Sequence, residues 1–110
     1  MEKIYNKLVR DNIPNIIKSN NEIPVTRILK DDEYKCELEK KLLEEYKEVL
    51  EAEKNDRIEE LADMLEIIKS LAELENKTLE DVIKVSELKQ QKRGSFKEKI
   101  FLEKVIDNKN

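Results

Sequence analysis

Apolar residues recur with helical spacing through the middle of the chain. From Asp31 to about Glu53 they return every three or four positions, and the same spacing resumes from about Arg57 to Leu74. This period places apolar side chains on one face of an α-helix. We therefore predict two long amphipathic helices, separated by a short polar break at 54–56. A connection this short favours antiparallel neighbours.

Shorter helices are predicted on either side of this pair. Asp11 can cap a helix that runs to about Ser19, with Pro14 tolerated in its first turn. Thr78, followed by an acid three residues later, resembles a capping box, and the helix it opens runs to about Gln91. The only glycine of the chain follows that helix and is expected to end it.

Two further segments have strand-like composition. Residues 24–29 are rich in β-branched side chains, and residues 99–105 alternate between polar and apolar positions. We expect short extended segments near both ends, which could pair with each other. The predicted fold is all-α, an antiparallel helical bundle, and its length indicates a single domain over residues 1–110.

Composition narrows the classes of protein that fit. Charged residues make up 44% of the chain and apolar residues 38%, with a net charge of −4. Acids and bases are interspersed, which argues against a nucleic-acid partner. Without a signal-peptide pattern or a membrane-length apolar run, we expect a soluble cytoplasmic protein. The single cysteine excludes an internal disulfide framework and fits a reducing compartment.

The absence of histidine from the sequence limits the available chemistry. A histidine general base, a Ser–His or Cys–His nucleophile pair and a His-ligated zinc site are all excluded. If the chain is an enzyme, carboxylates and hard metal ions are the expected tools.

Four carboxylates occupy unusual positions on the two long helices. With about 100° of rotation per residue, Glu45 falls inside the apolar face of the first helix and Glu48 at its edge. On the second helix, Glu60 falls inside the apolar face and Asp63 on its rim. The neighbouring acids face away from the apolar stripes: Glu44, Glu51, Glu59 and Glu66.

Two interpretations of these acids stay open. Burying an unpaired carboxylate costs on the order of several kcal/mol, so each buried acid needs a cation or a raised pKa. Antiparallel packing would gather all four acids, and oxygen-only ligands select Mg²⁺ or Mn²⁺ over zinc. Alternatively, the acids form a solvated face with Lys40 and Lys41 as partners of Glu44 and Glu45, or Glu60 faces a lysine across a subunit interface.

The acid pattern resembles a known signature. Glu44–Glu48 (EEYKE) and Glu60–Asp63 (ELAD) are similar to the E-E-x-x-E and E-x-x-D motifs of the MazG-like all-α nucleoside triphosphate pyrophosphohydrolase superfamily, although the spacer between them is short. Segments 5–14 (YNKLVRDNIP), 24–29 (PVTRIL) and 89–102 (KQQKRGSFKEKIFL) resemble its small stand-alone, house-cleaning, phosphoribosyl-ATP pyrophosphohydrolase-like branch. The resemblance covers nearly the whole chain.

This resemblance implies hydrolysis of a nucleoside triphosphate, often non-standard or damaged, to a monophosphate and pyrophosphate. It implies Mg²⁺, with Mn²⁺ as a substitute, and water attack on the α-phosphorus. By motif position, the metal ligands and catalytic residues are Glu45, Glu48, Glu60 and Asp63. Glu44 would support a second ion or orient a water. The alternatives are a phosphoribosyl-ATP pyrophosphatase or a non-enzymatic helical dimerisation module.

Substrate-binding residues are expected among the cations near both ends. Lys7 and Arg10 precede the first short helix, and Lys89 and Arg93 share a face at the end of the last one. Lysine and arginine are also common at the C-terminus of any helix, because they interact favourably with the helix dipole. Phe96 would stack on a nucleotide base or pack into the core.

The second long helix also predicts self-association. Its apolar arc is wider than one neighbouring helix can cover, and the domain is small for a stable monomer core. We therefore expect a homodimer or homotetramer.

Overall fold

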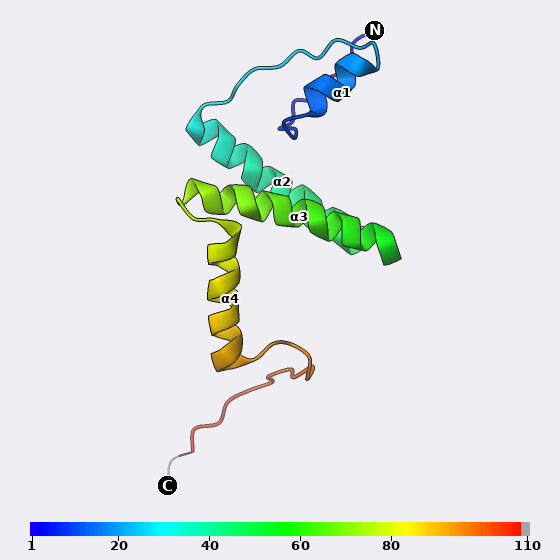
Figure 1. The fold of residues 1–110 in the computed structure, drawn as a ribbon. Coiled ribbons are helices and arrows are strands. Elements are labelled where there is room, and N and C mark those ends of the chain that lie inside the picture. The colour runs from blue at the N-terminus through cyan, green and yellow to red at the C-terminus, as the bar shows by residue number, and fades with distance from the viewer. Residues whose placement is uncertain (109–110) are drawn as a thin grey trace. The chain divides into compact units, whose positions relative to one another are not determined.

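The protein is described by a computed structural model covering residues 1–108, and these residues form helices but no strand (Figure 1). The helices are α1 (Ile13–Ser19), α2 (Asp31–Glu51), α3 (Lys54–Leu74) and α4 (Leu79–Arg93). The predicted all-α class is confirmed. Over the described range, every helix is too short or too polar to cross a membrane. The chain falls into two compact units, Met1–Leu79 and Glu80–Asn110. The single domain predicted from length stays a prediction.

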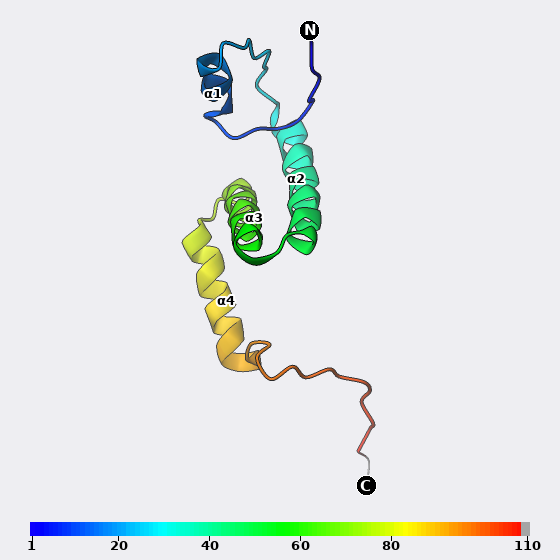
Figure 2. The same ribbon diagram turned by 90° about the vertical axis from the view of Figure 1, so that its right-hand side faces the viewer.

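Helices α2 and α3 lie side by side and antiparallel within the first unit (Figures 1 and 2). Their facing surfaces bury Leu38 and Val49 of α2 and Ile67 and Ala72 of α3. These positions follow the apolar period of the sequence, so the predicted antiparallel pair is confirmed.

Local sequence sets the ends of these helices. At the start of α2 the Lys30 backbone N–H donates to Glu33 Oε1 at 3.3 Å, which satisfies one of the free donors of the first turn. At the end of α3, Asn76 takes a left-handed φ of 58°. The N–H groups of Asn76 and Lys77 then donate to the carbonyls of Glu73 and Ala72. The predicted end of the second long helix at Leu74 is confirmed.

The connection between the long helices differs from the prediction. The break expected at 54–56 is wrong, because α2 ends at Glu51 and α3 already begins at Lys54. Ala52 and Glu53 are extended, and Lys54 has a left-handed φ of 55°, so the break begins two residues earlier than predicted. Polar residues such as those at 55–56 favour breaks, but they are equally favourable in a first helical turn, where acids interact well with the dipole.

Both short helices deviate slightly from expectation. Helix α1 begins after Asn12 and not after Asp11, with Pro14 in its first turn as predicted. Helix α4 begins directly after Thr78 and extends to Arg93, which is later than the predicted end near Gln91. Gly94 follows with a φ of 79°, a conformation that residues with a Cβ rarely adopt, and its N–H donates to the Gln90 carbonyl.

The predicted extended segments do not form strands. Among the described residues, neither 24–29 nor 99–105 is assigned to a strand, and Val25 and Ile28 are about fully exposed, at 96% and 95%. A strand needs a neighbour that pairs with its backbone N–H and C=O groups, and β-branched composition alone does not supply one. The pairing expected between these two segments joins different units of the chain and stays a prediction.

Large apolar side chains remain on the surface of the helix pair, which bears on self-association. Leu43 and Leu50 of α2 are 62% and 57% exposed, and Ile58 and Leu65 of α3 are 65% and 47% exposed. We call these four side chains the apolar patch, because exposed apolar surface commonly marks an interaction site.

We predict that the chain self-associates in solution through this patch. Light scattering coupled to size exclusion at micromolar concentration should give the mass of two or four chains. Replacing Leu43 with Glu should shift that mass toward the monomer, because a buried charge without a partner opposes association. Lys47→Glu, a charge change at an exposed polar position of α2, is the matched control. A monomeric wild-type protein would contradict the prediction.

Candidate metal centre

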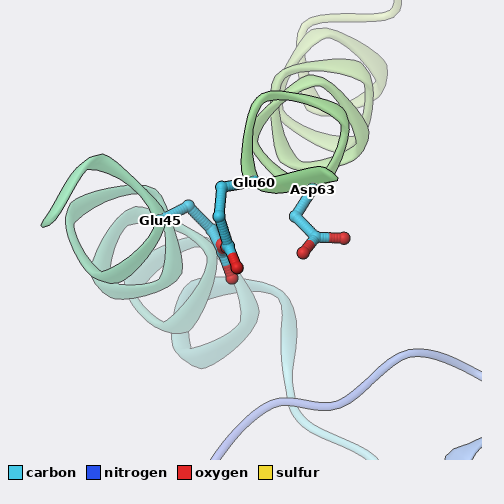
Figure 3. A group of neighbouring side chains, drawn as sticks. All are labelled: Glu45, Glu60 and Asp63. Atoms are coloured by element: carbon cyan, nitrogen blue, oxygen red, sulfur yellow. The ribbon is translucent and has the colours of Figure 1, made fainter. Parts of the chain in front are cut away.

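Three carboxylates converge between α2 and α3. Glu45 comes from α2, and Glu60 and Asp63 come from α3, one helical turn apart (Figure 3). One carboxylate oxygen from each residue lies within 4.8 Å of the others. The carboxyl groups of Glu45 and Glu60 point into the space between the helices, next to that of Asp63. We call these three residues the acid trio.

Two oxygens of the acid trio are buried without a hydrogen-bond donor. They are Oε2 of Glu45 and Oε2 of Glu60. Burying an acceptor without a partner costs about 1–3 kcal/mol, and more when the group is charged. Proteins meet this cost by protonating the carboxyl or by supplying a cation. The trio is therefore suited to either.

The pKa values of the trio reflect this crowding. A hydrogen bond shared with the Glu48 carboxyl, together with burial and the nearby Glu45 carboxyl, raises the pKa of Glu60 to about 7. Burial is the main reason that the pKa of Glu45 is raised, and the charges of Glu48 and Asp63 add to it. Like charges held this close cannot all ionise without cost. A divalent cation would remove that cost.

The remaining predicted acids lie at the margin of the trio. Glu48 is exposed, and its carboxyl interacts with those of Glu60 and Glu45, but it is not one of the three that converge within 4.8 Å. Glu44 pairs with Lys41 at 3.9 Å. For Glu44, a solvated helix face with a lysine partner is thus the arrangement observed.

A cation from the N-terminal segment reaches the trio. Arg10 Nη2 donates to Asp63 Oδ1 at 2.7 Å, although the two residues are 53 positions apart in sequence. In Figure 3 the N-terminal segment is the violet-blue ribbon in the lower part of the picture, below the three labelled side chains. Lys7 belongs to the same segment and is exposed. The sequence singled out Arg10 as a phosphate ligand but gave no sign of its contact with Asp63, because no local spacing links the two.

The other predicted substrate residues belong to the second unit. Lys89 and Arg93 lie on α4, and Arg93 and Phe96 line an open hollow of about 420 Å³ in the turn that follows. Phe96 is 96% exposed, so the alternative of a core position is wrong for the described chain. Sequence reasoning passed over two further cations of this hollow, Lys97 and Lys99, although the density of lysine there is a visible signal.

Comparison with known proteins shows a similarity over about half of this chain. An uncharacterized protein of Mycolicibacterium smegmatis is 46% identical to this chain over 50 residues, which cover 46% of this chain and 51% of that protein. The chain spans about half the length of the curated relative it matches. No protein-family model matches the chain, and no solved structure matches it.

The raised pKa of Glu60 predicts how stability depends on pH when metal is removed by a chelator. The folded state holds the Glu60 proton up to about pH 7, whereas the ordinary value is 4.5. Between these values the folded state binds more protons, so the free energy of unfolding should rise as pH falls from about 8 to about 5.5. Urea unfolding at several pH values measures this.

The matched variants for this prediction are Glu60→Gln and Glu59→Gln. Glu60→Gln should flatten the pH dependence, because it removes the group that titrates. Glu59 is exposed on the same helix, so Glu59→Gln should keep it. The hydrogen bond to Arg27 lowers the pKa of Glu33 below 4.5. The pH interval measured here lies above that value, so Glu33 does not contribute to the expected change. Equal pH dependence in all three proteins would refute the assignment.

Proposed function

We propose that this chain is a metal-dependent nucleoside triphosphate pyrophosphohydrolase of the MazG-like superfamily. The observation that carries the proposal is the acid trio, with two buried carboxylate oxygens that lack a donor. Crowded carboxylates of this kind are costly in a small domain unless they bind a cation. Their order along the chain follows the E-E-x-x-E and E-x-x-D motifs of that superfamily.

The donor set fits Mg²⁺ or Mn²⁺. All three side chains offer oxygen, which hard divalent cations prefer, and neither histidine nor cysteine is part of the group. The trio carries up to three negative charges, with Glu48 adjacent to it. One side of the group is less buried than the other, since the Asp63 side chain is 44% exposed, so this side is open to solvent.

In this proposal, Glu45, Glu60 and Asp63 hold the metal. A divalent ion held there supplies Lewis acidity to the phosphate oxygens and to the attacking water. Glu48 is exposed beside Glu60, where a carboxylate can accept the proton that the water loses. Arg10 and Lys7, in the segment next to the trio, provide positive charge for the phosphates. The reaction yields a nucleoside monophosphate and pyrophosphate.

A non-enzymatic role has one observation in its favour. The apolar patch of the helix pair would serve a helical dimerisation module as well as it serves an oligomeric enzyme. Phosphoribosyl-ATP pyrophosphatase activity is the enzymatic alternative, because it would use the same acidic chemistry. The two pyrophosphatase activities differ only in their substrate, whereas a dimerisation module would need no metal.

A nucleotide screen separates these alternatives. The protein is incubated with Mg²⁺ or Mn²⁺ and a panel of standard, oxidised and deaminated nucleoside triphosphates, together with phosphoribosyl-ATP. We expect pyrophosphate release from at least one triphosphate, and loss of that release in excess chelator. Phosphoribosyl-ATP as the sole substrate would favour the alternative enzyme. No release from any compound, with either metal, would favour the dimerisation module.

Metal binding by the trio is tested directly with variants. Glu60→Gln should lower the affinity for Mn²⁺ by at least about tenfold, since even groups that only support metal ligands typically contribute 10–100-fold. Glu59→Gln makes the same chemical change on the exposed face of α3 and should leave the affinity unchanged. Electron paramagnetic resonance of free Mn²⁺ reports the affinity without relying on activity. Wild-type affinity in Glu60→Gln would remove the basis of the proposal.

A further inference from the structure

The contact between Arg10 and Asp63 connects the N-terminal segment to the acid trio. The guanidinium lies 2.7 Å from Asp63 Oδ1, yet the side chains of Arg10 and Asp63 are 58% and 44% exposed. An ion pair this accessible to water contributes little stability. Its two partners can therefore separate readily when something else competes for either one.

A divalent ion in the trio would compete for Asp63. The Asp63 carboxylate oxygen that belongs to the trio lies within 4.8 Å of those from Glu45 and Glu60. An ion bound by these three oxygens would sit within a few ångströms of the Arg10 guanidinium, and the two positive charges would repel each other. The ion also takes over the neutralisation of Asp63, which is what Arg10 supplies in the structure.

A phosphate chain would then be the natural new partner of Arg10. The planar guanidinium forms paired hydrogen bonds with phosphate oxygens as well as with carboxylates. Arg10 lies beside the trio on a segment outside the long helices, with its backbone carbonyl accepting from the Ile13 N–H at 3.0 Å. A shift of the side chain alone can therefore change its partner without moving α2 or α3.

We propose that Arg10 exchanges partners during binding: it pairs with Asp63 in the metal-free protein and with the substrate's phosphate chain once a divalent ion occupies the acid trio. This inference rests on the proposed function. It makes Arg10 a competitor of the metal and a ligand of the phosphate, so its removal affects the two binding steps in opposite directions. A purely structural role would shift both in the same direction.

The first measurement is Mn²⁺ affinity by electron paramagnetic resonance at low salt, without nucleotide. Arg10→Gln should bind Mn²⁺ about three- to tenfold more tightly than wild type, and the gain should shrink at high salt because the repulsion is screened. Arg10→Lys keeps the charge and should stay near wild type. Arg27→Gln removes an equal charge from an exposed pair with Glu33 and should have no effect.

The second measurement uses inorganic tripolyphosphate as the probe, by calorimetry at saturating Mn²⁺. Arg10→Gln should weaken its binding by about tenfold or more, because a charge-assisted contact is lost.

The outcomes distinguish this inference from the function on which it rests. If wild type fails to bind Mn²⁺, the proposed function itself fails. If wild type binds Mn²⁺ but Arg10→Gln binds it equally or more weakly, the exchange of partners is refuted while the metal site stands. Tighter Mn²⁺ binding with unchanged tripolyphosphate binding also refutes the exchange, because Arg10 then competes with the ion without serving the phosphate.

Discussion

The structure of the helix pair depends on how negative charge is accommodated between α2 and α3. Apolar packing at Leu38, Val49, Ile67 and Ala72 brings the two helices together, and the same approach places Glu45 against Glu60. The packing therefore enforces a repulsion that an isolated helix would not experience. A hydrogen bond shared with the Glu48 carboxyl is the largest reason that the pKa of Glu60 is raised to about 7, and burial and the nearby Glu45 carboxyl add to it. Crowded carboxylates in a thin core lower the stability of the fold, and such costs are common at binding sites.

Charge around the trio is balanced by groups that differ in how firmly they are fixed. Glu45 and Glu60 are held by rigid helices and have buried oxygens, whereas Asp63 is half-exposed at the rim. Arg10 comes from a segment outside the helix pair and satisfies only this outer carboxylate. The buried oxygens of Glu45 and Glu60 can accept a cation or a proton, whereas the exposed pair of Asp63 with Arg10 can be replaced. In the proposed function, the metal would therefore bind the inner carboxylates, and the phosphate chain would bind Arg10.

Apolar side chains are also exposed on the surface of the chain. Apolar side chains such as Leu43 and Ile58 extend the helix pair's core outward, and the tail after Gly94 exposes Phe96 beside several lysines. In a protein with 44% charged residues, large apolar side chains are nevertheless exposed along much of the described chain. They are consistent with a chain whose apolar area is completed by association, and the proposed enzyme would gain a more rigid site from it.

The sequence by itself determined the helices, because the apolar period and the glycine that ends the last helix are local signals, which act within a few residues of one another. The same period separated Glu45 and Glu60 from solvent-facing acids such as Glu59. It misplaced the break at 54–56 and suggested strands that do not form, since turn residues are ambiguous and a strand depends on a partner. Only the tertiary structure decided that Glu45 meets Glu60 and that Arg10 reaches Asp63. These contacts join residues far apart in sequence, and their distances follow from how the helices pack, which no local spacing encodes.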